Sequence, residues 1–274
     1  MLSPVLARRY ATAQFQPDLW LWGQRGNDYE RQRQRVNKTL SLKDKDILVA
    51  GCGTGRDIES WVKMAPRKVV GLDWFSYERA WEMWRKRLAV IAPKVNVEFA
   101  QGDLSRLEEI QTSSFDVVGS DAVFEHIQDM PAVLKQLHRI LRPGGILYAT
   151  FGPLWYSWGG DHVSGYDSIE SGFNHLLLDD AEWRSYLDKV GDQAHSEHDG
   201  RTWIEHDLFS HLRPVEYLEH LQRAGFERQF VSAIIDPRAV DVLNKCPGKA
   251  KHLLSDHSQL DLVVTGMTVI LQRI

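Results

Sequence analysis

Short apolar runs alternate with amphipathic stretches five times between residues 45 and 152 of this 274-residue chain. The runs are brief, rich in branched residues and closed by glycine or aspartate, which is typical of strands buried on both faces of a parallel sheet. They read DILVAG (46–51), KVVGLD (68–73), VNVEFAQGD (95–103), FDVVGSD (115–121) and ILYATFG (146–152). This alternation predicts an α/β fold with a doubly wound, mostly parallel sheet and right-handed crossovers.

The alternation of apolar runs and amphipathic stretches stops after residue 152 and resumes at residue 213. The later part contains helical patterns at 213–226 and 237–246. It also contains apolar runs at 227–235 and 261–273. The two runs bring the expected number of strands to seven. We therefore expect a helical N-terminal arm at 1–44 and one domain at 45–274, in which 153–212 is an insertion after strand five.

Composition and charge limit the class of protein. A formal net charge of -4 gives no reason to expect nonspecific attraction to nucleic acid or to an anionic membrane. No apolar run reaches the ~18 residues needed to cross a bilayer. Cys52 and Cys246 form no CxxC pair, so we expect a reducing compartment, the cytoplasm. Residues 1–15 lack the apolar core of a secretion signal and are read as an ordinary arm; the oligomeric state is left open.

The first run ends in a glycine-rich loop, AGCGTGRD, which contains Gly51, Gly53 and Gly55. Ligands of such sheets bind beyond the carboxyl ends of the strands, where glycine lets the backbone approach them closely. Asp73 follows Gly53 by twenty residues and ends the second run, where a carboxylate can accept both ribose hydroxyls. Asp103 ends the third run and is placed to accept from an adenine amino group. No GKS or GKT follows the glycines, so the pattern indicates an adenosine-containing ligand without phosphates.

Several motifs stand in a familiar order: LVAGCGTG, VVGLD, QGD, FDVVGSDAVFEHI and LRPGGILYATFG. In that order they resemble class I S-adenosylmethionine (SAM)-dependent methyltransferases, in a branch with EHI and LRPGG motifs that acts on small molecules or glycans. The resemblance implies SAM as cofactor and a last strand inserted antiparallel between strands five and six. It assigns cofactor binding to Gly51, Cys52, Gly53, Gly55, Asp73, Trp74, Asp103, Leu104, Ser120 and Asp121. Arg56 and Asp57 follow the glycine loop, and either bind the amino acid end of SAM or begin an exposed helix.

Methyl transfer to a hydroxyl requires a base as well as alignment of the reacting atoms. Glu125 and His126 of the EHI motif lie near the cofactor by position, and His162 lies ten residues beyond the end of the fifth run. Histidine titrates near neutrality, so His162 is the preferred base, with His126 and Glu125 as further catalytic candidates. The histidines and acids of the insertion have no metal-ligand spacing such as HExxH, so we expect no metal site.

The segment GPLWYSWGGDH (152–162) leaves the fifth run on the ligand side of the sheet. Its aromatic residues Trp155, Tyr156 and Trp158 are candidates for the substrate-binding wall, because flat apolar faces suit rings and chains of many acceptors. We therefore expect the insertion to act as a substrate lid, with an amphipathic helix at 179–190 that Asp179 or Asp180 caps.

The expected function is SAM-dependent O-methylation of a small molecule or a glycan, without a nucleic-acid partner. One alternative keeps the cofactor and changes the acceptor to RNA or protein, which the basic run Arg31, Arg33 and Arg35 motivates. A second alternative is a non-catalytic regulatory protein that binds SAM. The intact glycine loop and both acidic residues argue against it.

Overall fold

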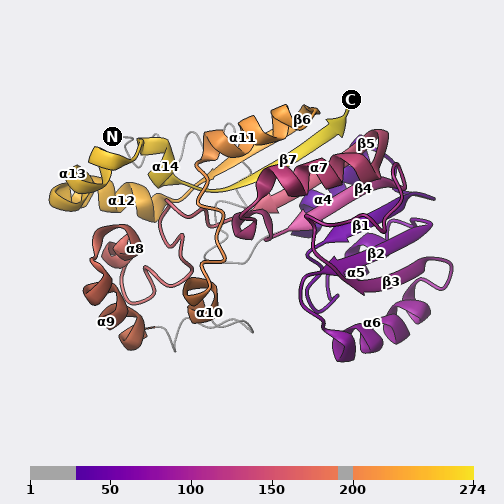
Figure 1. Ribbon diagram of the computed structural model, residues 1–274, viewed down its shortest axis with the longest axis horizontal. Helices are drawn as coiled ribbons and strands as arrows, with labels where there is room; N and C mark the ends of the chain where they lie inside the picture. Colours follow the sequence, from indigo (N-terminus) through magenta and orange to yellow (C-terminus); the bar gives the residue numbers. More distant parts are fainter. Residues whose placement is uncertain (1–28, 191–199) are drawn as a thin grey trace.

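The computed structural model describes residues 29–190 and 200–274, and within them a seven-stranded sheet with the order β3-β2-β1-β4-β5-β7-β6 (Figure 1). β1 to β5 pair in parallel, whereas β7 runs antiparallel to both β5 and β6. The strands are β1 (Asp46–Ala50), β2 (Lys68–Asp73), β3 (Asn96–Gln101), β4 (Phe115–Asp121), β5 (Leu141–Phe151), β6 (Phe226–Ile235) and β7 (Val264–Arg273). The predicted doubly wound α/β fold and the antiparallel last strand are confirmed.

Helices cover both faces of the sheet. On β1, Ile47 and Val49 belong to one apolar cluster, while Leu48 and Ala50 belong to another. Successive side chains of a strand point to opposite faces, so this strand is buried on both sides, as its unbroken apolar run predicts. The helices outside the insertion are α4 (Tyr29–Thr39), α5 (Ile58–Val62), α6 (Glu78–Ile91), α7 (Met130–Ile140), α11 (Pro214–Arg223), α12 (Pro237–Lys245), α13 (Pro247–Asp256) and α14 (Gln259–Val263), of which α12 to α14 lie beyond the end of the sheet (Figure 1). Among the described residues, no helix is both long and apolar enough to cross a bilayer.

The segment between β5 and α11 folds into short helices beside the sheet (Figure 1). They are η2 (Ile169–Ser171), α8 (Asn174–Leu177), α9 (Asp180–Val190) and α10 (Gly200–Glu205). Val163 and Leu187 belong to a small apolar cluster of this segment's own. Asp179 caps α9, since its carboxylate accepts hydrogen bonds from two backbone N–H groups of the first turn.

The EHI motif forms a 3-10 turn of its own, η1 (Phe124–His126), because Asp129 caps α7 through the Ala132 N–H and so fixes where that helix begins. Two boundaries differ from the sequence prediction. β5 already begins at Leu141, and the register shift between Phe115 and Val117 of β4 accommodates the extra residues. Residues 261–263 end α14 rather than begin β7, because Ser258 caps that helix.

Candidate functional site

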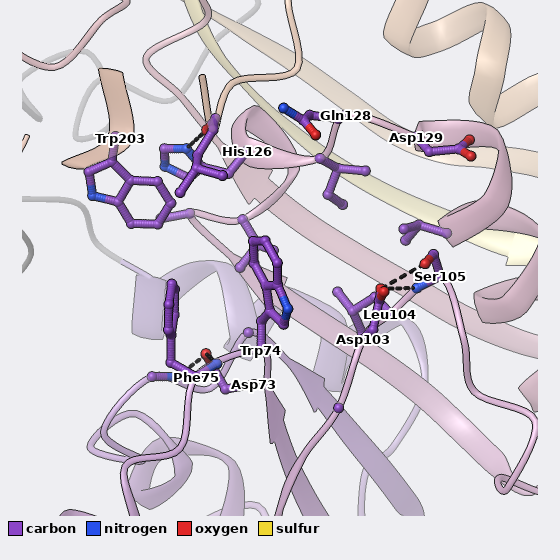
Figure 2. A pocket seen from close by; sticks show the side chains of 18 of the residues that line it. Asp73, Trp74, Phe75, Asp103, Leu104, Ser105, His126, Gln128, Asp129 and Trp203 are labelled. Carbon is purple, nitrogen blue, oxygen red and sulfur yellow. Dashed lines mark hydrogen bonds between the residues drawn. The ribbon is translucent and has the colours of Figure 1, made fainter. Parts of the chain in front are cut away.

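A pocket of about 430 Å³ opens at the carboxyl ends of β1 to β4 and extends to α10 (Figure 2). Its position is the one at which parallel α/β sheets bind their ligands, where successive strand ends converge. The lining residues are Gly51, Gly53, Asp73, Trp74, Phe75, Tyr77, Gly102, Asp103, Leu104, Ser105, Ala122, Val123, His126, Ile127, Gln128, Asp129, Val133, Trp203 and Leu208.

The glycine loop presents open backbone to this pocket. Gly53 has a φ of +50°, a backbone conformation that favours glycine. No atom lies within 4 Å of the point where a Cβ would stand, so the Gly53 backbone faces open space. Its N–H donates to Asp73 Oδ2 at 2.7 Å, and its carbonyl accepts from Trp81 Nε1 at 2.8 Å. Gly51 also lines the pocket, and a Cβ there would lie 2.1 Å from the Val123 side chain. These contacts fix the loop before any ligand binds.

Asp73 and Asp103 stand at the ends of β2 and β3 and both line the pocket. Asp73 accepts from the Gly53 and Phe75 N–H groups, one on each oxygen. Asp103 Oδ1 accepts from the N–H and the hydroxyl of Ser105, which hold the carboxylate in place. Each acid is therefore oriented by hydrogen bonds from nearby groups and lies on the pocket wall.

Four of the sequence-predicted cofactor residues do not line the pocket. Gly55 packs under the Phe99 ring, which a Cβ would approach to 2.6 Å, and the Ser120 hydroxyl donates to the Ala50 carbonyl. Cys52 is buried, and burial raises the pKa of its thiol. These three residues support the loop and the strand ends without lining the pocket. Asp121, the fourth, takes part in a separate ionic cluster.

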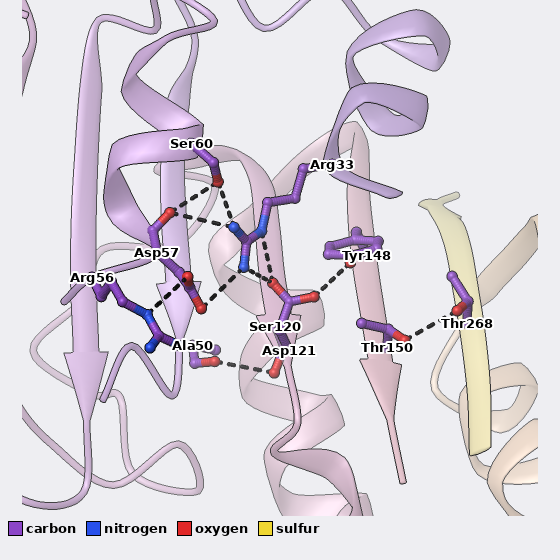
Figure 3. Close-up of polar contacts among 10 residues, drawn as sticks. All are labelled: Arg33, Ala50, Arg56, Asp57, Ser60, Ser120, Asp121, Tyr148, Thr150 and Thr268. Carbon is purple, nitrogen blue, oxygen red and sulfur yellow. Dashed lines mark hydrogen bonds and ion pairs between the residues drawn. The ribbon is translucent and has the colours of Figure 1, made fainter. Parts of the chain in front are cut away.

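Arg33 of α4 is the centre of that cluster (Figure 3). Its guanidinium donates to Asp121 Oδ2 at 2.9 and 2.7 Å and also to the Ser60 hydroxyl. Tyr148 donates to the other Asp121 oxygen at 2.5 Å. Burial raises the pKa of the Asp121 carboxyl, while Arg33 and Tyr148 oppose that shift by favouring the carboxylate. The arginine therefore fastens the helix that precedes β1 to the end of β4 and to α5.

The neighbouring basic residues have different surroundings. The Arg35 guanidinium lies 4.1 Å from the Phe230 ring centroid, in a cation–π contact. Arg56, a candidate for the amino acid end of the cofactor, is 79% exposed and lies 3.7 Å from Asp57. Sequence reasoning did not find the internal role of Arg33, because a basic run of this kind usually lies on a solvated helix face. Its signal is its spacing with Val36, which is also buried on α4.

His126 is the catalytic candidate that reaches the pocket. Its Nδ1 lies 2.7 Å from the Leu208 carbonyl oxygen, which can only accept, so Nδ1 carries the proton and Nε2 has the free lone pair. The ring stacks on Trp203, with centroids 4.1 Å apart at 28°. Burial lowers the pKa of His126 to about 4, although the Leu208 contact opposes the shift. The imidazole is therefore neutral near pH 7.

His162 lies behind His126, with ring centroids 5.0 Å apart, and does not line the pocket. Its Nε2 is buried without a hydrogen-bond partner among the described residues, and burial lowers its pKa to about 3. Glu125 is 2% exposed, and burial raises its pKa to about 8. Neither Glu125 oxygen makes a hydrogen bond within the described chain, although the nearby Glu125 and Gly152 amides oppose the rise.

The three aromatic candidates of residues 152–162 lie outside the pocket lining. Trp158 is buried in the insertion, donates from Nε1 to the Ile169 carbonyl at 2.8 Å, and is covered by Arg238. The Tyr156 ring contacts Arg213 and His257, beside the last helices. Trp155 comes nearer to the site, since it packs on Phe209, which in turn contacts His126.

Three aromatic residues that the sequence reasoning did not assign line the pocket: Phe75, Tyr77 and Trp203. Phe75 has a sequence signal, because it lies two residues beyond Asp73 at the carboxyl end of β2. Trp203 has none, because its place depends on how α10 folds back over η1. In the described ranges 29–190 and 200–274, no three His, Cys, Asp or Glu side chains converge as metal ligands do.

Known proteins are similar to parts of this sequence. Residues 48–149 match a family model described as a methyltransferase domain. The chain is 31% identical over 178 residues to a malonyl-[acyl-carrier protein] O-methyltransferase of Halalkalibacterium halodurans, across 58% of this chain and 60% of that protein. It is 34% identical over 168 residues to a probable S-adenosylmethionine-dependent methyltransferase of Mycolicibacterium smegmatis, across 60% of this chain and 59% of that protein. It thus spans about three-fifths of the length of these curated relatives.

Solved structures share the architecture. An S-adenosylmethionine-dependent methyltransferase from Mesorhizobium loti superposes with a TM-score of 0.52 at 18% identity, over 88% of this chain and 96% of that chain. At this identity the likeness shows the fold alone.

Proposed function

We propose that the chain transfers a methyl group from SAM to a hydroxyl oxygen of a small molecule or a glycan, since residues 48–149 match a family model described as a methyltransferase domain. One observation carries the proposal: Gly53, Asp73, Asp103 and His126 line a single pocket. That pocket combines acceptors for an adenosine with a neutral imidazole. The similarity to an O-methyltransferase of Halalkalibacterium halodurans supports oxygen as the acceptor atom.

The described residues fit the cofactor. The open backbone at Gly53 leaves space for the methionine part, and the Asp73 carboxylate on the pocket wall accepts from the ribose hydroxyls. Asp103 accepts from the adenine amino group, while Leu104 and Trp74 offer apolar surface to the ring. Trp74 is 60% exposed and has the free surface that this contact requires.

The bound cofactor supplies an electrophilic methyl group on a sulfonium sulfur. The chain's own residues orient the acceptor and hold its proton. His126 Nε2 accepts that proton, because Leu208 occupies Nδ1 and the ring is neutral near pH 7. Trp203 covers one side of the imidazole and keeps water away from it. His162 lies behind His126 and holds its ring in position. Glu125 supports η1 from within the core.

The insertion at 153–212 acts as the substrate lid of the 45–274 domain. Trp203 and Leu208, both within the insertion, line the pocket, and the Leu208 carbonyl contacts the proposed base. Trp155 supports the lid through Phe209 rather than by direct contact with the acceptor. His126 of the EHI motif thus joins the lid to the cofactor pocket through its contact with Leu208.

The alternatives have less support. The basic run that motivates an RNA or protein acceptor contains Arg33, which is buried in an ion pair, and Arg35, which contacts Phe230. The Arg33 guanidinium is therefore not available to a polyanion. The non-catalytic reading explains neither the fixed tautomer of His126 nor its position on the pocket wall.

Incubation with methyl-labelled SAM and fractionated metabolites tests the proposal. We expect S-adenosylhomocysteine (SAH) to form in equal amount to a methylated product from one fraction. Asp73→Asn should greatly reduce turnover at a fixed low SAM concentration, and Glu109→Gln, which neutralises an exposed acid elsewhere, should not. SAM binding without SAH formation in any fraction would favour the regulatory reading. Product recovered on RNA or protein would favour the other alternative.

A further inference from the structure

The end of the insertion is hydrogen-bonded to the pocket wall at two neighbouring positions. His126 Nδ1 lies 2.7 Å from the Leu208 carbonyl oxygen. Two residues further along, Gln128 Nε2 donates to the Asp207 carbonyl at 2.5 Å. His126 and Gln128 both line the pocket (Figure 2), and the same is true of Leu208. We call residues 207–210 the clasp, because they connect the insertion to this wall.

One end of the clasp is anchored in the core. The buried Ser210 donates its N–H to the Glu125 carbonyl at 2.8 Å, and its hydroxyl hydrogen-bonds the Tyr217 hydroxyl. Tyr217 is itself buried and donates to the Phe124 carbonyl at 3.5 Å. Phe209, the neighbour of Ser210, is also buried. Segments with buried contacts of this kind are the last to open, so we expect this end to stay in place.

The other end of the clasp lies at the surface. Asp207 and Gln128 are both exposed, so water competes for the hydrogen bond between them. Asp207 has a φ of +47°, and His211, directly after the clasp, has a φ of +43°. Residues other than glycine lose free energy in this left-handed conformation and keep it only where their contacts hold them. We therefore expect the Asp207 end to open at lower cost than the anchored end.

The carbonyl next to this exposed end determines where His126 carries its proton. An accepting oxygen at Nδ1 selects the tautomer with the proton on Nδ1, which leaves the lone pair on Nε2. A histidine ring without such a partner carries its proton mainly on Nε2 in water, and Nε2 then has no lone pair for another proton. Since the Asp207 and Leu208 carbonyls are one residue apart, opening the clasp at Asp207 moves the Leu208 carbonyl away from the ring.

We propose that closure of the clasp places His126 in its proton-accepting tautomer, and that Gln128 is the positioning residue that holds the clasp closed. The inference rests on the proposed function, since it concerns the base of that reaction. It makes the base dependent on the position of the insertion. Gln128 does not touch the reacting atoms in this account, because it acts through the Asp207 and Leu208 carbonyls.

Nitrogen-15 NMR of the histidine rings in the unliganded protein tests this inference near pH 7. The averaged chemical shifts of Nδ1 and Nε2 report the fractions of the two neutral tautomers, and His126→Gln identifies the His126 signals. In the parent we expect the proton on Nδ1. Gln128→Met keeps the length of the side chain but removes the donor to Asp207. It should raise the fraction of the Nε2-protonated tautomer roughly three- to tenfold.

Two further variants control the measurement. Gln128→Lys supplies an N–H donor to the Asp207 carbonyl again and should restore the parent shifts. Gln111→Met makes the same exchange at an exposed glutamine outside the pocket and should leave the His126 shifts unchanged. Equal His126 shifts in the parent and Gln128→Met would overturn the inference, and so would a parent ring protonated on Nε2.

A separate calorimetric titration with SAM distinguishes this inference from the proposed function, because the NMR measurement needs no ligand. SAM binding together with unchanged tautomers in Gln128→Met leaves the cofactor site standing and refutes the role of the clasp. The expected change of tautomer in a protein that does not bind SAM confirms the contact between clasp and ring but overturns the proposed function.

Discussion

The indole Nε1 of Trp81 donates a hydrogen bond of 2.8 Å to the carbonyl oxygen of Gly53. Trp81 lies on the buried face of α6, is 1% exposed, and stacks on Phe99 with ring centroids 5.7 Å apart. A residue of the hydrophobic core therefore holds the glycine loop that faces the pocket. The loop is fixed from both sides, because Gly53 also donates its N–H to Asp73.

Trp81→Phe should weaken SAM binding without unfolding the protein. The smaller ring keeps most of the contact with Phe99 but leaves the Gly53 carbonyl without its donor. We expect a loss of about 1 kcal/mol in the free energy of unfolding and a dissociation constant for SAM raised roughly three- to tenfold. Urea denaturation and calorimetry measure the two effects. Unchanged affinity together with reduced stability would show that the contact serves the core alone.

Arg33→Met should destabilise the fold strongly, because it leaves the Asp121 carboxylate buried beside Tyr148 without its cation. Loss of one partner of a buried pair costs about 3–5 kcal/mol. The double variant Arg33→Met/Asp121→Asn should recover much of that loss, since no unpaired charge remains. A double-mutant cycle from urea denaturation measures this coupling. Strict additivity of the two single changes would contradict an ion pair at this position.

Glu125 should make the protein less stable as the pH rises. Its folded pKa is about 8, above its ordinary value of 4.5, so between these values the folded state binds one proton more than the unfolded state. The free energy of unfolding should therefore fall by up to about 1.4 kcal/mol per pH unit through this group. Glu125→Gln removes this contribution. The difference in stability between the two proteins should grow in favour of the variant from pH 6 to pH 8.

The histidines do not confuse that comparison. The folded pKa values of His126 and His162 are lowered, so their effect on the pH dependence of stability has the opposite sign. It is present in both proteins and cancels in the difference. Equal slopes for the parent and the variant would show that the Glu125 carboxyl titrates normally.

His126→Gln should reduce kcat by roughly 10²–10⁴-fold while leaving SAM affinity unchanged, because it removes the base but keeps a side chain that can donate to Leu208. A phenol acidic enough to be ionised at the assay pH needs no base. With such an ionised phenol as acceptor, the loss of kcat caused by His126→Gln should largely disappear. A loss of the same size with both acceptors would indicate a positioning role for His126 rather than proton transfer.

The sequence predicted the sheet well, because the alternation of buried strands and helices depends on local periodicity. It also located the three strand ends that carry Gly53, Asp73 and Asp103. The acceptor side was harder, since Trp203 reaches the pocket only through the path of the insertion, which no local pattern specifies. Trp158 is the opposite case, because it was expected in the substrate-binding wall and does not line the pocket. It lies near a strand end but packs inward, in contact with Ile169 and Arg238.

Among the charged residues, too, local sequence predicts some surroundings and not others. The run Arg31 to Arg35 has the composition of a solvated face, yet Arg33 pairs with Asp121, a residue 88 positions further along the chain. Long-range partners of this kind are fixed by the topology, which brings α4 over the end of β4. They cannot be identified from spacing within α4 alone.

Calorimetric titration with SAM tests the central claim, that this pocket is a SAM site, most directly. The parent protein should bind one SAM per chain, and Asp73→Asn should weaken binding roughly ten- to a hundredfold, because hydrogen bonds to a charged group are lost. Glu109→Gln, an exposed acid outside the pocket, should bind as the parent does. Absence of SAM binding to the parent, or equal binding by the parent and Asp73→Asn, would contradict the account.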